Sequence, residues 1–226
     1  MRNLQNIVQT IEKELEDKDR VREGALRASR ELIRLSKDVL GAMNRKEDPR
    51  PLLGQMRKDA AKLRAQTGKY PELYHAGYVE AALAEVVEIC LLYAILDKAT
   101  LPTPKELSAT PESYLLGLGD VIGELRRMAV DALRAMRPED AEARLTEMET
   151  IYEALMRFDF PDAVVPLRKK QDVARSLVER TRGEVLVARS EKALKDKLDR
   201  VAAHLDRSYG GGQGQRRYHG RDQRQR

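Results

Sequence analysis

Hydrophobic residues recur along most of this chain three or four positions apart, the spacing of an amphipathic helix. The pattern runs from Leu4 to Leu40 and predicts one long helix over residues 2–45, ended by Pro49 and Pro51. No alternation typical of β-strands and no repeat of fixed period is found. The chain is therefore predicted to be an all-α, multi-helix bundle of about six to seven helices, long at both ends. The other helices are predicted over residues 51–66, 71–98, 112–136, 138–157 and 166–207.

The third predicted helix becomes wholly apolar over residues 89–96, so we expect it to lie buried at the centre. This run is the longest in the chain, yet it is far shorter than the ~20 residues that cross a bilayer, so no membrane is expected. Cys90, the single cysteine, lies inside it, which excludes a disulfide framework and fits a core position. Since the N-terminal sequence also lacks an apolar signal segment, a cytoplasmic protein is expected.

Composition narrows the class further. The 226 residues are 35% charged and 4% aromatic, a mixture that favours long helices over sheets. The net charge is +5, but the last nineteen residues hold five arginines and one aspartate and so carry +4 of it. Polyanion binding by the nearly neutral body would therefore depend on how its charges are arranged. Residues 1–207 are expected to form one helical domain, and residues 208–226, rich in Gly, Gln and Arg, a disordered tail.

The fourth predicted helix carries the most informative pattern. Asp120 and Glu124 lie one turn apart on the face opposite its apolar stripe, and carboxylates so placed suit a hard divalent cation such as Mg²⁺. Such a pair is also common on a solvated helix face, and this alternative stays open. Three glycines, each costing about 1 kcal/mol in a helix interior, indicate that another backbone or a ligand approaches closely. They are Gly117, Gly119 and Gly123.

Two groups of basic residues are candidates for contact with a nucleic-acid backbone. Arg126 and Arg127 follow the acidic pair and are placed to hold a phosphate through bidentate contacts; salt bridges within the protein are the alternative. On the first helix, basic residues recur three or four positions apart, a stripe able to follow an RNA strand, with an ordinary solvated face as the alternative. They are Arg27, Arg30, Arg34 and Lys37.

Three stretches, in the correct order, resemble the translin family. The first lies between Asp17 and Lys37. The second is the fourth helix, with Tyr114-Leu115-Leu116-Gly117, Asp120 and Gly123-Glu124-Leu125. The third lies between Leu167 and Gly183. The resemblance covers about residues 15–190 and is nearer to translin-associated factor X and its archaeal homologues than to translin itself.

This resemblance implies a bundle of about seven helices that assembles into a closed, barrel-like homo-oligomer. It also implies binding of single-stranded RNA, with single-stranded DNA as a further ligand, and a Mg²⁺-dependent endoribonuclease activity. In the factor X branch, the catalytic carboxylates that hold the metal lie on two adjacent helices. Carried over residue by residue, they are Glu80, Asp120 and Glu124.

One position departs from the family's pattern, because Gly77 stands where a further glutamate is expected. Glu85 and Glu88 on the same helix are candidates to replace it, with ion pairing to lysine or arginine as the alternative. Retention of three acidic residues out of four favours an active enzyme. Two other functions stay open: an oligomer that binds single-stranded nucleic acid without cutting it, and a helical scaffold for protein partners.

Overall fold

The computed structural model describes residues 3–210, apart from the side chains of residues 206 and 208–210. Every regular element in this part of the chain is a helix, which confirms the predicted all-α class. The last helix continues three residues beyond its expected end, and the rest of the expected tail lies outside the described residues. The helices are α1 (Leu4–Asn44), α2 (Arg50–Thr67), α3 (Pro71–Tyr74), α4 (Gly77–Leu96), α5 (Pro111–Arg134), α6 (Pro138–Leu155) and α7 (Arg168–Gly210).

The prediction of a single helix over residues 71–98 is wrong at one point, because this segment divides into α3 and α4. Ala76 takes an extended backbone conformation, with φ −69° and ψ 139°, which interrupts the helical hydrogen bonds. The hydrophobic spacing continues across this break, so the sequence pattern did not reveal it. As a result, Glu80 lies in the first turn of α4, and His75 lies immediately before that helix.

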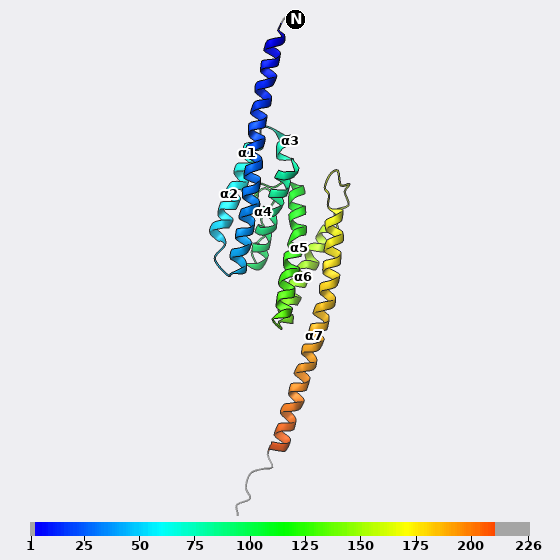
Figure 1. Cartoon of the computed structure of the whole chain (residues 1–226). Helices are drawn as coiled ribbons and strands as arrows, with labels where there is room; N and C mark the ends of the chain where they lie inside the picture. Colours follow the sequence, from blue (N-terminus) through cyan, green and yellow to red (C-terminus); the bar gives the residue numbers. More distant parts are fainter. Residues whose placement is uncertain (1–2, 211–226) are drawn as a thin grey trace, which may run out of the picture.

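α4 and α5 form the centre of the molecule (Figure 1). α4 packs against α1, α2 and α5, whereas α5 also packs against α6 and α7. Eleven residues of α4 are buried, as predicted for a central helix. Cys90 is one of them, and burial raises the pKa of its thiol, which favours the unreactive protonated form. None of the described helices is long and apolar enough to cross a membrane.

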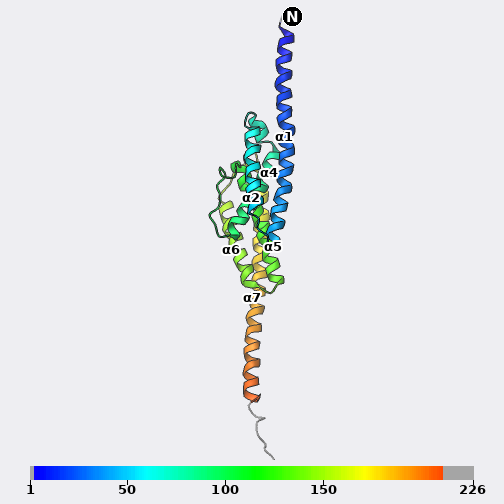
Figure 2. The ribbon, with the colours of Figure 1, turned by 90° about the vertical axis from the view of Figure 1, so that its left-hand side faces the viewer.

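The two longest helices project beyond the body at opposite ends (Figures 1 and 2). The second half of α1 packs on the body through positions such as Ala25, Leu32 and Val39, whereas the apolar residues of its first half are exposed. From Leu186 onward, α7 likewise exposes an apolar row. The two exposed apolar rows consist of Leu4, Ile7, Val8, Ile11 and Leu15 on α1, and of Leu186, Val187, Leu194, Leu198, Val201 and Leu205 on α7.

Candidate functional site

The candidate site is built on the close, parallel packing of α4 and α5. Gly117 of α5 lies so near α4 that a Cβ there would come within 2.4 Å of the Ala84 carbonyl oxygen and 2.8 Å of the Val87 Cβ. One helical turn further along each helix, Glu88 and Asp120 face the same region. The close backbone approach that the glycine pattern predicted is thus present at Gly117.

Four carboxylates lie near one another at this level of the helix pair. Burial, followed by repulsion from Asp120, Glu85 and Glu124, raises the pKa of Glu88 to about 8. Glu88 is therefore largely protonated at neutral pH, which limits the mutual repulsion. The cluster lies under α1 as well, because the Ser36 hydroxyl donates to Glu85 across 3.0 Å.

Two basic side chains compensate the negative charge of the cluster. Lys170 lies near the start of α7, which packs on α5, and its ammonium group donates to Asp120. Arg127 donates to the Glu124 carboxylate with N···O distances of 2.5 and 3.0 Å. In this conformation both carboxylates of the predicted α5 pair are therefore engaged by cationic side chains.

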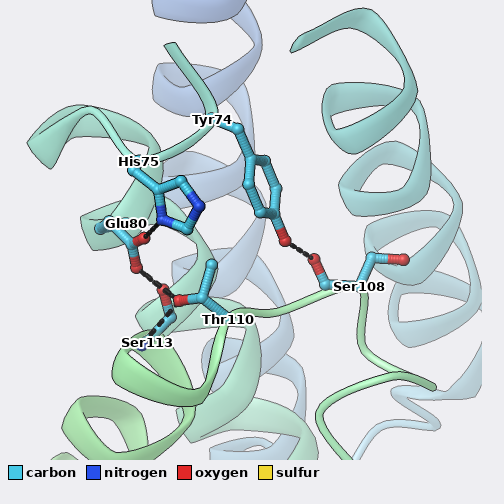
Figure 3. A network of polar contacts seen from close by, with 6 residues as sticks. All are labelled: Tyr74, His75, Glu80, Ser108, Thr110 and Ser113. Carbon is cyan, nitrogen blue, oxygen red and sulfur yellow. Dashed lines mark hydrogen bonds and ion pairs between the residues drawn. The ribbon is translucent and has the colours of Figure 1, made fainter. Parts of the chain in front are cut away.

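Glu80, the third predicted ligand, belongs to a different group of residues (Figure 3). Its carboxylate accepts hydrogen bonds from Thr110, at 2.7 Å, and from Ser113, and lies 3.2 Å from His75 Nδ1. Thr110 is also the N-cap of α5, where its hydroxyl oxygen accepts from the Ser113 backbone N–H. Glu80 thus joins the start of α4 to the start of α5 through hydrogen bonds. It lies two helical turns before Glu88 along α4.

The structure does not bring Glu80, Asp120 and Glu124 together as one ligand set. Within the described part of the chain, no three Asp, Glu, His or Cys side chains already stand in an arrangement that could hold a metal ion. The chemistry of Asp120, Glu124 and Glu88 nevertheless fits Mg²⁺, which prefers carboxylate oxygens and keeps several waters. A divalent cation would also offset the repulsion from neighbouring carboxylates that, after burial, raises the pKa of Glu88. Binding would require Asp120 and Glu124 to exchange their present partners.

The two arginines that follow the acidic pair differ in their surroundings. Arg126 is only 14% exposed, and its guanidinium makes a bidentate pair with Glu184 of α7, at 2.5 and 2.7 Å. This pairing holds the pKa of the Glu184 carboxyl below its usual value and joins α5 to α7. Arg126 therefore has a structural partner, the alternative that the sequence left open. Arg127 is more exposed, at 44%, and borders the acidic cluster.

The basic stripe on α1 reaches the same region. Arg30, Lys37 and Asn44 are seven residues apart and so share one flank of the helix. At the end of this flank, Asn44 Oδ1 accepts from Arg127 Nη2 at 3.4 Å, close to Glu124. Within the side chains that the structure describes, the stripe makes no ion pair with a carboxylate. Its members Arg27, Arg30, Arg34 and Lys37 are all exposed.

Sequence reasoning missed Lys170 as a residue of this site. No local spacing marks it, because Lys170 and Asp120 are 50 residues apart and meet only through the packing of α7 on α5. Glu88 was weighed as a replacement for the acid absent at Gly77, and the structure places it in the cluster. Glu85 is placed there too, although it is bonded to Ser36.

The fold and this cluster define an all-helical protein in which carboxylates of two central helices adjoin a basic helix flank. The translin family model matches residues 4–186, so the chain belongs to the translin family, as its motifs predicted. It is 34% identical over 194 residues to the uncharacterized protein MJ0175 of Methanocaldococcus jannaschii, which covers 84% of this chain and 86% of that protein.

Two solved structures are also similar. The crystal structure of AfC3PO is 34% identical, with a TM-score of 0.75, and the match covers 82% of this chain and 98% of that one. The structure of an AfC3PO–duplex RNA complex is 32% identical, with a TM-score of 0.69 and the same shares of both chains. The second of these relatives is thus a protein seen bound to RNA.

Proposed function

We propose that this protein binds RNA and cuts it with the help of a divalent metal ion, as an endoribonuclease of the translin type. One observation carries the proposal: the carboxylates of α4 and α5 adjoin an exposed basic flank of α1. The contacts from Ser36 to Glu85 and from Asn44 to Arg127 join the two surfaces. The complex of the relative AfC3PO with duplex RNA supports RNA as the ligand.

In this proposal, the basic residues bind the RNA and the carboxylates hold the metal ion. Arg30, Arg34 and Lys37 would attract the phosphates and lead the strand toward α5, where Arg127 would hold a phosphate beside the cluster. Asp120, Glu124 and Glu88 would hold Mg²⁺. When bound, Mg²⁺ supplies a hydroxide from its water and stabilises the charge that develops on the phosphate. Glu80 would act as a positioning residue, since its hydrogen bonds fix the start of α5.

We further infer that single-stranded RNA is the substrate, with single-stranded DNA as a further ligand, and that the protein works as a homo-oligomer. The apolar rows of α1 and α7 support assembly, because each lies on a helix that extends beyond the body and has hydrophobic side chains 45–67% exposed. A closed, barrel-like arrangement of copies would cover both rows and enclose the RNA.

Cleavage of labelled single-stranded RNA by the purified protein, with Mg²⁺ and with excess EDTA, tests this proposal. Asp120→Asn should abolish cleavage while preserving RNA binding. Asp131→Asn is the matched control, because Asp131 is an exposed aspartate of the same helix whose one ion pair among the described side chains is with Arg134, at 3.8 Å. Equal cleavage by wild type and Asp120→Asn would refute the assigned site. Binding without cleavage by wild type would make the protein a non-catalytic RNA-binding oligomer.

A further inference from the structure

Lys170 does not have the surroundings of an ordinary surface lysine. Its side chain is 35% exposed, and its ammonium group donates to Asp120 of α5. The stem lies along Gly119, where an added Cβ would be 3.4 Å from the Lys170 Cβ. Packing of α7 on α5 therefore delivers one positive charge directly to the acidic cluster.

We propose that Lys170 is an internal counter-ion that occupies Asp120 in the metal-free protein and competes with a divalent cation for that carboxylate. This inference rests on the proposed metal-dependent function and adds a residue to its site. The loaded and unloaded states would then differ in the position of the Lys170 side chain, which leaves Asp120 when the cation binds, as well as in the pairing of Glu124 with Arg127.

The electrostatics of the cluster favour replacement of Lys170 by a divalent cation at Asp120. Asp120 and Glu124 each have a cationic partner, but these partners differ in origin. Arg127 lies three residues from Glu124 on the same helix, so its pairing follows from local geometry. Lys170 comes from another helix and is held there only by the tertiary fold. An ammonium group and a divalent cation bound to the same carboxylate would repel each other at close range, which favours departure of the ammonium group when the cation binds.

The side chain of Lys170 also allows the movement. An ammonium on a flexible four-carbon stem can leave one carboxylate without displacing its backbone. Lys169 provides the comparison, because it is adjacent in the chain and exposed, and makes no ion pair among the described side chains. A change confined to Lys170 would therefore report on the pairing with Asp120 and not on the general charge of the start of α7.

Binding of Mn²⁺, measured by electron paramagnetic resonance without RNA, tests the inference directly. Lys170→Met keeps a side chain of similar length and removes the charge, so it should bind Mn²⁺ about three- to tenfold more tightly than wild type. Lys169→Met should bind like wild type. Lys170→Arg keeps the charge and should not gain affinity. Circular dichroism checks the fold, and Lys170→Gln serves as a second neutral variant if Lys170→Met does not fold.

The outcomes separate this inference from the proposed function. Unchanged or weaker Mn²⁺ binding by the folded neutral variant, beside normal binding by wild type, would overturn the role of Lys170 and leave the metal site intact. Absence of Mn²⁺ binding from wild type and from every variant would overturn both. Binding by Lys170→Met alone would support the competition, since it would show that Lys170 keeps the site closed.

Discussion

Gly117 of α5 lies so close to Ala84 of α4 that only a hydrogen atom fits between the Gly117 Cα and the α4 backbone at this point. An added Cβ would lie 2.4 Å from the Ala84 carbonyl oxygen. Side chains one turn further on, among them Glu88 and Asp120, are therefore near enough to interact strongly. The spacing of two helices is thus the basis of the electrostatics of the candidate site.

Gly117→Ala should destabilise the protein by about 1–3 kcal/mol, because α4 must move to admit the new methyl group. Gly123→Ala is the matched control: a Cβ at this exposed position of the same helix meets no atom within 4 Å. That variant should be more stable by about 1 kcal/mol, from helix propensity alone. Urea unfolding followed by circular dichroism measures both changes. Equal effects of the two substitutions would show that the close approach of Gly117 to Ala84 does not affect stability.

The raised pKa of Glu88 predicts that stability falls as the pH rises. The folded state holds a proton on Glu88 up to a pKa of about 8, whereas the unfolded state releases it near 4.5. Between these values the folded state binds more protons, so the free energy of unfolding decreases from about pH 4.5 to about pH 8. The contribution of this one group over that window is on the order of a few kcal/mol.

Glu88→Gln isolates this contribution. The variant should match wild type near pH 4, where Glu88 is protonated in both the folded and the unfolded state, and should be more stable at pH 8. Urea midpoints at several pH values, measured in EDTA, check this, and Mg²⁺ should reduce the pH dependence of wild type only. If Glu88→Gln and wild type lose stability in parallel as the pH rises, Glu88 does not titrate in this window.

Glu80 and Asp120 should respond differently to loss of charge. Glu80→Gln weakens the hydrogen bonds from Thr110 and Ser113, so it should lower stability by about 1–2 kcal/mol. Its Mn²⁺ affinity should stay near that of wild type, whereas Asp120→Asn should lose most of its binding. A large loss of Mn²⁺ affinity in Glu80→Gln would restore Glu80 to the ligand set that the family motif predicts.

Much of the fold was predictable because helical periodicity and proline positions are local properties. The limits of α1, α2, α5 and α6 agree with prediction within about two residues. The break at Ala76 was missed, since it leaves the hydrophobic pattern in register. In the site, Asp120, Glu124 and Arg127 share one helix and so could be grouped from spacing alone. Spacing alone could not show that Glu88 belongs to the acidic cluster and Glu80 does not, because that depends on how α4 is placed along α5.

Substitution of Arg126 should affect mainly the stability of the protein, whereas substitution of Arg127 should affect mainly its RNA binding. Arg126→Ala breaks the bidentate pair with Glu184 and leaves that carboxylate without its principal partner, which should cost about 1–3 kcal/mol. Arg127→Ala should change stability by less than about 1 kcal/mol, since its ion pair is exposed, but it should weaken RNA binding. Thermal melts and filter binding compare the two variants. A weaker RNA affinity in a stable Arg126→Ala protein would reverse this assignment.

The basic flank of α1 should control the salt dependence of RNA binding. If Arg30 and Lys37 each contact a phosphate, replacing either by alanine should reduce the slope of log K against log salt concentration by about 0.7. The control is Lys58→Ala, because Lys58 is an exposed lysine of α2 outside this flank. Its removal should leave the slope unchanged. Fluorescence anisotropy with a single-stranded RNA, between low and moderate salt, measures each slope. Equal slopes for Lys37→Ala, Lys58→Ala and wild type would place the RNA elsewhere on the molecule.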